Sequence, residues 1–244
     1  MKTTNKRFKS VKRNVATNLL LGAIVISVGT LCFAPLQATV ETDGENYELY
    51  RNASESSSSV SLMFNVYWGT EEVYRILDIL QANEANATFF IGGCWADDNV
   101  ECLKAIHEAG HEIGNHGYFH KDHSKLTAEQ NRNEITSCNR FIELAIGQKI
   151  TLFAPPSGAY GNDMLSVCKS LGMKTVLWSK DTIDWRDKNA SVIYTRATKN
   201  VKGGDFVLMH PMKETADALN DILKYYQKNN LTVVTVSDNL LTKG

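Results

Sequence analysis

Short apolar runs alternate with amphipathic segments along most of the chain. From residue 60 onward, runs rich in Val, Ile, Phe and Leu are each followed by a segment whose apolar positions recur three and four apart. The runs are typical of buried strands and the segments of helices that cover a sheet. The alternation therefore predicts repeated strand–helix units and a mostly parallel sheet in an α/β fold.

The predicted strands are Val60–Tyr67, Ala87–Ile91, Glu112–Gly114, Ile150–Phe153, Thr175–Trp178, Phe206–Met209 and Leu231–Val236. The predicted helices are Glu71–Ala82, Val100–Ala109, Ala128–Ile146, Asp163–Leu171, Ala190–Asn200 and Ala216–Asn229. Thr127 and Gln130 have the spacing of a capping box at the start of the third helix. Gly110 and Gly172 directly follow predicted helices, where a left-handed residue commonly ends the helix.

The N-terminal part of the chain has a different pattern. Six basic and no acidic residues lie in residues 1–14, and an apolar stretch follows over residues 15–34. This order predicts a signal peptide or signal anchor over residues 1–38, and the apolar stretch is just long enough to span a bilayer. We therefore expect an extracellular or cell-surface protein, with cleavage left open. Residues 39–59 are polar and predict a linker, so that the domain proper is residues 60–244.

The charge balance argues against nucleic-acid binding. Removing the six N-terminal basic residues from the total of 26 leaves 20 basic against 27 acidic residues, a net charge of −7 for the remainder. A body this acidic gains nothing from contact with a phosphate backbone. Nor does the chain contain a glycine-rich phosphate-binding loop.

Four cysteines remain beyond the N-terminal segment: Cys94, Cys102, Cys138 and Cys168. An even number in an exported chain allows two disulfides, and four buried thiols are an equally good interpretation. No pair has the spacing of a structural zinc site.

Residues that can carry chemistry follow the predicted strands. Asn65, His116, Pro155, Asp181 and His210 each lie at, or a few residues beyond, the carboxyl end of an apolar run. Such residues from many parallel strands can meet at one place if the sheet closes into a barrel, whose carboxyl-end loops form one mouth. An open sheet would concentrate its site at a single switch point instead. The pattern therefore favours a barrel.

Two constellations stand out among these residues. His116 and His120, four residues apart, can hold one ion, and neutral imidazoles suit zinc, cobalt or another first-row divalent metal. Asp184 precedes an aromatic residue, Trp185, and is a candidate to orient His210 and raise its pKa, as a general acid requires. Trp185 offers a flat apolar surface for a sugar ring.

Five segments together resemble one family, the polysaccharide deacetylases (NodB-homology domain). They are Ala87–Gly92, Gly110–His116, Pro155–Gly158, Asp181–Trp185 and Leu208–His210, in the order of the family's motifs over about residues 60 to 240. The resemblance implies a distorted (β/α) barrel of about seven parallel strands. It also implies removal of N-acetyl groups from an amino-sugar polymer such as peptidoglycan or a chitin-like glycan.

The same resemblance assigns a role to individual residues. His116 and His120 correspond to metal ligands, and His210 to the general acid that Asp184 orients. The residues that would line the groove for the glycan and its acetyl group are Pro155, Trp185 and Leu208.

Three positions depart from the family pattern. Asn65 and Val66 stand where the family has two consecutive aspartates, a general base and a third metal ligand, and Ala154 replaces the arginine that tethers the base. Asn does not accept a proton at neutral pH and Val does not bind a metal. Asp181, which lies among the motif residues, is the better candidate for a substitute carboxylate, ahead of the pair Glu71–Glu72 at a helix start.

Three functional hypotheses follow. The leading one is an exported, metal-assisted hydrolase of the polysaccharide deacetylase type, whose catalytic competence is in doubt. The second is a catalytically silent barrel that binds glycan through Trp185 and the aromatic pair Tyr67–Trp68. The third is a membrane-anchored structural protein, which leaves the retained histidines without a purpose. The sequence predicts no oligomeric state.

Overall fold

The computed structural model describes residues 47–241 of the 244-residue chain. The strands are β1 (Leu49–Tyr50), β2 (Ser59–Val66), β3 (Thr88–Ile91), β4 (Glu112–Asn115), β5 (Leu152–Phe153), β6 (Lys174–Val176), β7 (Lys180–Asp181), β8 (Phe206–Met209) and β9 (Thr232–Val233). The α-helices are α2 (Thr70–Ala82), α3 (Gly93–Asp98), α4 (Val100–Glu108), α5 (Ala128–Ile146), α6 (Asn162–Ser170), α7 (Asp184–Asp187), α8 (Ala190–Thr198), α9 (Lys213–Lys228) and α10 (Val236–Leu241). Two 3₁₀ turns, η1 (His123–Lys125) and η2 (Pro156–Gly158), complete the described elements.

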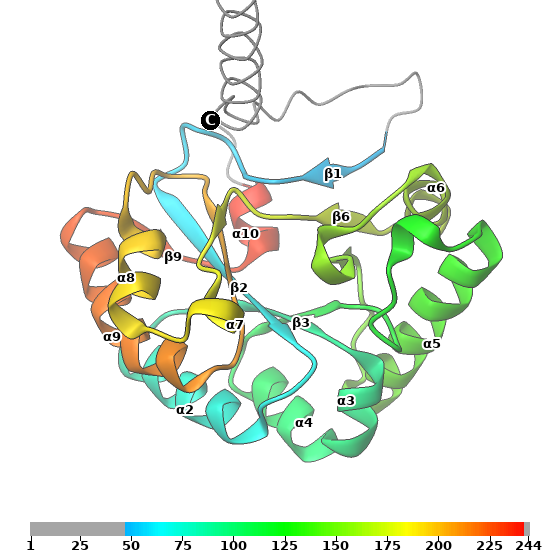
Figure 1. Ribbon diagram of the computed structural model, residues 1–244, viewed down its shortest axis with the longest axis horizontal. Helices are drawn as coiled ribbons and strands as arrows, with labels where there is room; N and C mark the ends of the chain where they lie inside the picture. Colours follow the sequence, from blue (N-terminus) through cyan, green and yellow to red (C-terminus); the bar gives the residue numbers. More distant parts are fainter. Residues whose placement is uncertain (1–46, 242–244) are drawn as a thin grey trace, which may run out of the picture. The chain divides into compact units, whose positions relative to one another are not determined.

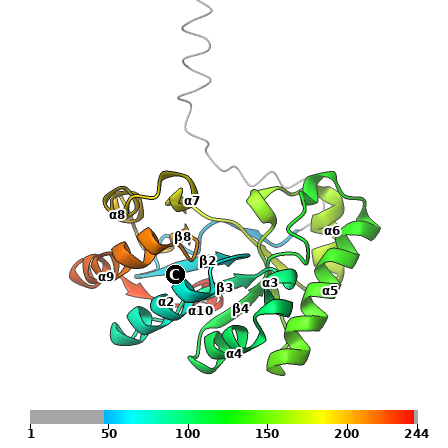
Figure 2. The ribbon, with the colours of Figure 1, turned by 60° about the horizontal axis from the view of Figure 1, so that its bottom comes forward.

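The strands form one sheet in the order β1-β6-β5-β4-β3-β2-β8-β7, with β9 paired to the start of β2. Every strand pair in it is parallel. Helices surround the strands, α2, α8 and α9 on one side and α5 and α6 on the other (Figures 1 and 2). The predicted distorted (β/α) barrel is confirmed, with more and shorter strands than the seven expected.

The barrel is distorted where its two edge strands meet. Residues 177–179, which connect β6 to β7, bond to β1 and to β8: Leu177 N donates to Tyr50 O, and Ser179 N donates to Phe206 O. An isolated antiparallel bridge between Asn52 and Asp205 lies in the same region. A connecting segment therefore closes the barrel here instead of a continuous ladder.

Alternation along the strands divides the core into two. Met63, Phe90 and Leu208 belong to an inner cluster, whereas their neighbours Phe64 and Phe89 pack outward under the helices with rings stacked 5.0 Å apart. Both faces of the strands are thus buried, which explains why they read as continuous apolar runs. The alternation also directs residues two positions beyond the inner cluster toward the mouth of the barrel.

The amino end of the barrel is closed by α10. Val236 and Leu240 of this helix pack with the inner cluster, and Asn239 Nδ2 donates to Ser61 Oγ. In Figure 1, α10 lies within the ring of the other helices. The opposite, carboxyl end is therefore the end at which a site can open, as is general for βα barrels.

Part of the predicted linker is wrong. Residues 47–59 are packed against the barrel: Leu49 and Tyr50 pair with Thr175 and Val176, and Ala53 is buried in the inner cluster. A two-residue strand has no alternation to reveal it, and its few apolar residues are diluted by serines. The domain therefore begins at or before residue 47.

Other differences are local. Only Thr232–Val233 of the predicted last strand pairs in the sheet, and the next residues begin α10. The short elements β1, β7, α3, α7 and α10 were not predicted, since fewer than seven residues carry little periodicity. The capping box is confirmed, with Gln130 N donating to Thr127 Oγ1 and Thr127 N to Gln130 Oε1. All four cysteines from Cys94 onward are free thiols, and three of them are buried, which agrees with the second of the two interpretations that the sequence left open.

The predicted export segment, residues 1–38, lies outside the described residues. Within residues 47–241, no helix combines the length and the apolar character needed to cross a membrane.

Candidate active site

The carboxyl end of the barrel gathers the residues that the sequence singled out. Asn65, His116, Ala154 and His210 each lie two residues beyond an inward-facing position of their strand or its neighbour, so the alternation brings them to one mouth. His210 lies close enough to His116 and His120 for its charge to contribute to the lowering of their pKa values. The mouth has two sides, which differ in how completely their polar groups are paired.

The first side, called here the His210 side, consists of Asp184, His210 and Thr215. Asp184 is fully buried at the start of α7, and its Oδ1 lies 2.7 Å from His210 Nδ1. A carboxylate can only accept, so Nδ1 carries the proton and Nε2 is left as an acceptor. Asp184 Oδ2 accepts 2.7 Å hydrogen bonds from Thr215 Oγ1 and from the backbone N of His210.

Asp184 therefore fixes both the ring and the backbone of His210. Its Oδ1 also accepts from Trp185 N at 2.9 Å, so four donors surround this buried carboxylate. The predicted orienting role of Asp184 agrees with this geometry. Thr215, in the first turn of α9, was missed, because nothing in the sequence distinguishes it from any other threonine near a helix start.

The second side, called here the Asn65 side, consists of Asn65, Val66, His116, His120 and Ala154. Asn65 is 3% exposed, and its Oδ1 has no hydrogen-bond partner within the described residues. Val66 is fully buried in the outer cluster together with Phe64, so its side chain packs under the helices. The position that the resemblance assigns to a metal-binding aspartate thus holds an apolar side chain that is part of the core.

The two histidines of this side lie together. Their ring centroids are 5.1 Å apart, and His116 Nδ1 lies 2.7 Å from Ala154 O. A carbonyl only accepts, so His116 Nδ1 carries the proton and Nε2 has a free lone pair. Burial, with His120 close by, lowers the pKa of His116 to about 3, and burial also lowers the pKa of His120. Both imidazoles are therefore neutral at physiological pH.

The donor set does not fit a divalent metal held by protein side chains. Zinc in catalytic sites takes three protein ligands, each of which supplies a nitrogen, oxygen or sulfur donor. Here two imidazoles are present, but Val66, at the position of the third ligand in the family pattern, offers no donor. Across residues 47–241, no three His, Cys, Asp or Glu side chains come close enough together to hold an ion. The predicted zinc or cobalt site at His116 and His120 therefore lacks its third ligand.

The candidate substitute carboxylates differ in position. Asp181, half-buried on β7, interacts electrostatically with His210 and Asp184, and burial raises its pKa. Its Oδ1 accepts from Ile183 N at 2.8 Å. Glu71 and Glu72 lie in the first turn of α2, where Glu72 is paired with Arg75 at 2.8 Å. Asp181 is therefore the carboxylate best placed to act in the mouth.

Aromatic side chains cover both sides of the mouth. Trp68 stacks on the His210 ring, with centroids 5.5 Å apart and planes 6° from parallel, and its Nε1 donates to Met212 Sδ. Tyr67 lies 4.7 Å from the His120 ring. Trp68 is 40% and Trp185 is 51% exposed, whereas the other predicted substrate residues, Pro155 and Leu208, are buried. Trp68 and Trp185 are therefore the most exposed of the predicted binding residues.

The loop that carries the two histidines is anchored from α5 by Glu134. This carboxylate is 5% exposed, accepts from Tyr118 N and Phe119 N, and pairs with Lys121 Nζ at 2.9 Å. Sequence reasoning missed Glu134. A signal exists, since Glu134 occupies the buried stripe of α5 with Ile135, Cys138 and Ile142, where a carboxylate is rare unless it is paired.

Comparison with known proteins agrees with this architecture. The family model for polysaccharide deacetylase matches residues 52–176. The chain is 35% identical over 208 residues to the Bacillus subtilis protein YlxY, covering 85% of this chain and 65% of YlxY, just under two thirds of that protein. It is 35% identical over 175 residues to a peptidoglycan-N-acetylglucosamine deacetylase of Bacillus cereus, covering 69% of this chain and 82% of the relative.

A similar solved structure bears on the departures from the family pattern. BA3943 of Bacillus anthracis, described as a CE4 family pseudoenzyme, aligns with a TM-score of 0.78 and 33% identity over 80% of this chain and 70% of that one. The family match, the relatives and the barrel agree with one another. The chain belongs to the polysaccharide deacetylase family of hydrolases, as a divergent member that lacks the first-motif aspartates.

Proposed function

We propose that the chain binds an amino-sugar polymer of the cell wall, peptidoglycan or a chitin-like glycan, with hydrolysis of its N-acetyl groups lost or strongly reduced. One observation carries the proposal. On the His210 side of the mouth four donors satisfy the buried Asp184 carboxylate, whereas the Asn65 side has an amide and a valine where the family pattern has carboxylates. The similarity to peptidoglycan deacetylases and to a pseudoenzyme of the same family supports both halves of the proposal.

Loss of the base has a defined cost. General base catalysis typically contributes about 10²–10⁴-fold to a rate. The Asn65 amide cannot take a proton from water at neutral pH, and Ala154 offers no positive charge to hold a base in place. Val66 cannot complete a metal site, because its side chain is part of the outer core. The three losses affect the same step, which is the activation of water.

The retained groups suit binding. His210 is held rigidly by Asp184, so its Nε2 can accept a hydrogen bond from a sugar hydroxyl or amide at little further entropic cost. Trp68 is fixed by its stack on His210 and by its bond to Met212, and Trp185 stands on the short helix that Asp184 begins. Rigid, partly exposed aromatic rings are suitable surfaces for the apolar faces of sugars.

A second candidate function is residual deacetylation. The raised pKa of Asp181 and its proximity to His210 favour it, since a carboxylate with a raised pKa is a better proton acceptor. In this alternative Asp181 would take a proton from the attacking water, and a His210 that carries a second proton, on Nε2, would give that proton to the departing amine. A divalent metal, zinc or cobalt, would have to be held by His116 and His120 with ligands from water or substrate.

We also propose that the protein is exported, and is secreted or anchored by residues 15–34. The support is the order of residues at the N-terminus, where six basic residues precede the apolar stretch. Export would place the mouth in contact with the cell-wall polymer.

The test compares binding with hydrolysis in one preparation. The full chain, with zinc added, is titrated with N-acetylglucosamine tetramer and with peptidoglycan fragments while acetate release is measured. We expect binding that Trp68→Ala weakens, and no acetate release above that of a His116→Ala variant. Acetate release abolished by chelation, by His116→Ala and by His210→Ala would establish the second candidate instead. Absence of binding to either glycan would refute the proposal.

A further inference from the structure

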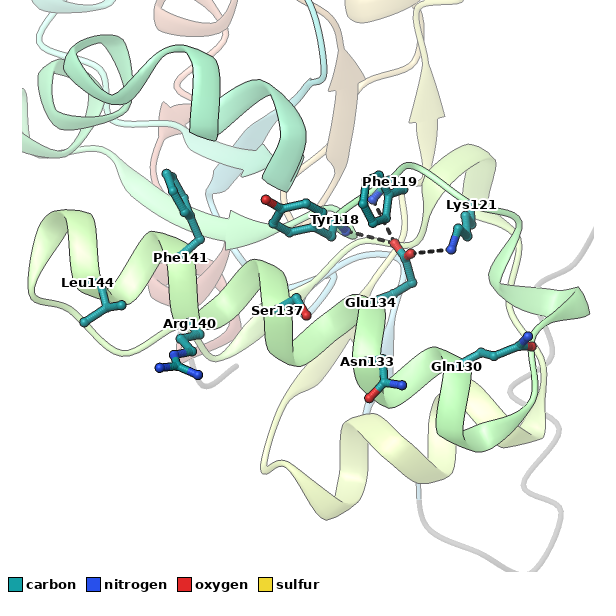
Figure 3. Close-up of a pocket in the computed structure, with 10 residues that line it drawn as sticks. All are labelled: Tyr118, Phe119, Lys121, Gln130, Asn133, Glu134, Ser137, Arg140, Phe141 and Leu144. Atoms are coloured by element: carbon teal, nitrogen blue, oxygen red, sulfur yellow. Dashed lines mark hydrogen bonds and ion pairs between the residues drawn. The ribbon is translucent and has the colours of Figure 1, made fainter.

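A groove of about 600 Å³ lies between α5 and the histidine loop, which is the segment from His116 to Lys121 (Figure 3). Tyr118, Phe119 and Lys121 of the loop line one end, and Arg140, Phe141 and Leu144 of α5 line the other. The groove is mainly apolar but carries two cations. Neither the family motifs nor the proposed function accounts for it.

The wall nearest the mouth is rigid. Glu134 holds the backbone N atoms of Tyr118 and Phe119 at 3.1 and 2.8 Å and binds Lys121, as the dashed lines in Figure 3 mark. Lys121 Nζ in turn lies 5.2 Å from the Phe119 ring centroid. These contacts join the loop to α5, so the aromatic wall is preorganised for a ligand.

The groove adjoins the mouth, because residues 116–121 supply His116 and His120 to the mouth and Tyr118, Phe119 and Lys121 to the groove. A Cβ on Gly92 would lie 2.3 Å from the Tyr67 ring, and a Cβ on Gly93 would lie 2.3 Å from the Tyr118 ring. Tyr67 and Tyr118 therefore rest directly on neighbouring residues at the end of β3. Tyr67 covers His120 in the mouth, whereas Tyr118 lines the groove. A polymer bound in the mouth would therefore have the groove next to it.

The far end of the groove carries an uncompensated charge. Arg140 is exposed, and within residues 47–241 its guanidinium has no ion pair or hydrogen bond. The other cation, Lys121, is neutralised by Glu134. Phe141 and Leu144 lie beside Arg140, and Leu144 is 78% exposed. An arginine among apolar side chains, on an otherwise acidic molecule, complements a carboxylate that is attached to a small apolar group.

We propose that this groove binds an acidic peptide substituent carried by the glycan strand, with Arg140 pairing with a peptide carboxylate. The proposal rests on glycan binding in the mouth and narrows its ligand to a peptide-bearing polymer. From Glu134 to Leu144, α5 rises roughly 15 Å, which matches about four extended residues. A neutral glycan would offer Arg140 no carboxylate, so the charge favours the peptide.

The test uses three probes on the full chain: N-acetylglucosamine tetramer, a disaccharide that carries an acidic tetrapeptide, and the same disaccharide-peptide with its carboxylates amidated. Affinities are measured for the wild type, for Arg140→Ala and for Arg132→Ala. Arg132 is the matched control, since it lies on the same helix but bonds to Ser170 Oγ outside the groove. We expect Arg140→Ala to lower the affinity for the acidic peptide ligand about tenfold. Its affinity for the tetramer and for the amidated ligand should be unchanged.

Each other outcome overturns the proposal in a recognisable way. If Arg140→Ala leaves the affinity for the acidic ligand unchanged, or lowers the affinity for the amidated ligand equally, the groove does not recognise a carboxylate. Glycan binding in the mouth is not affected by that result. If the wild type binds none of the three probes, glycan binding itself fails. If the wild type associates with itself and Leu144→Ser abolishes that association without changing ligand affinity, the occupant is a second copy of the chain.

Discussion

The two sides of the mouth differ in the completeness of their hydrogen bonding. On the His210 side, one buried carboxylate satisfies four donors and fixes the ring that it faces. On the Asn65 side, a buried amide oxygen has no hydrogen-bond partner among residues 47–241, and the neighbouring valine belongs to the core. Both sides are built on strands of the same sheet, so the difference arises from a few side chains and leaves the frame intact.

The comparison teaches that the parts of a hydrolytic site can be lost separately. The His210 side also supports the fold, since Asp184 ties together α7, β8 and α9. Its replacement would damage stability as well as chemistry. The Asn65 side lacks both carboxylates of the family pattern, and the barrel around it is nevertheless packed. A protein that needs only to bind can therefore keep the first side and lose the second.

The largest loss of stability is expected when a carboxylate is put back at position 66. Val66→Asp would place a carboxyl group in the outer core without a partner, and we expect the free energy of unfolding to fall by about 4–5 kcal/mol. Val66→Thr, of similar shape, should cost less than half as much. Urea unfolding measures both. A Val66→Asp protein of unchanged stability that binds one zinc ion would remove the distinction between the two sides.

A slightly smaller loss of stability is expected from a change on the His210 side. Asp184→Ala leaves the donors of Thr215, Trp185 and His210 without their acceptor in a fully buried place. We expect a loss of about 3–4 kcal/mol by urea unfolding. The matched control is Asp181→Ala, whose half-buried carboxylate accepts a single backbone hydrogen bond, and which should cost about 1 kcal/mol. Equal effects of the two changes would contradict the central place of Asp184.

Acid should destabilise the frame independently of the mouth. Burial lowers the pKa of His111, at the start of β4, from 6.5 to about 4. Between these values the unfolded chain takes up a proton that the folded chain does not. The contribution of His111 to the free energy of unfolding is therefore fully present above pH 6.5. Between pH 6.5 and pH 4 it falls by about 1.4 kcal/mol per pH unit. His111→Gln should reduce the slope of stability against pH by that amount, and an unaltered slope would refute the assignment.

The smallest effect is expected at the unpaired amide. Asn65→Ala removes a buried oxygen that no group in the described part of the chain bonds. The packing lost with the side chain is therefore offset, because the cost of burying an unpaired oxygen disappears. The free energy of unfolding should change by less than about 1 kcal/mol. A loss as large as that of Asp184→Ala would mean that Asn65 has an essential partner and that the two sides are equally integrated.

Sequence reasoning predicts the frame well, for a physical reason. Strands buried on both faces, such as β2 and β8, are continuous apolar runs, and long helices such as α5 have a clear period and a capping box. The barrel could be inferred because candidate site residues follow the carboxyl ends of several predicted strands. Elements of a few residues, such as β1 and α10, carry too little periodicity, so residues 47–59 were wrongly assigned to the linker.

The site was predictable only where a motif marks it. The proximity of His116 to His120 and of Asp184 to His210 agrees with expectation. The supporting residues Thr215 and Glu134 act through tertiary contacts, which no local pattern reveals. The orientation of Val66 into the core likewise required the register of β2.

The most direct test of the central claim is acetate release by the wild-type chain under conditions in which glycan binding is saturated. The full chain is incubated with N-acetylglucosamine tetramer and zinc at concentrations where titration shows the mouth to be filled, and acetate is counted per molecule of protein. The account predicts full occupancy with less than one acetate released per molecule. Many acetates released per molecule, with release stopped by a chelator, would show that the Asn65 side still supports hydrolysis and would contradict the account.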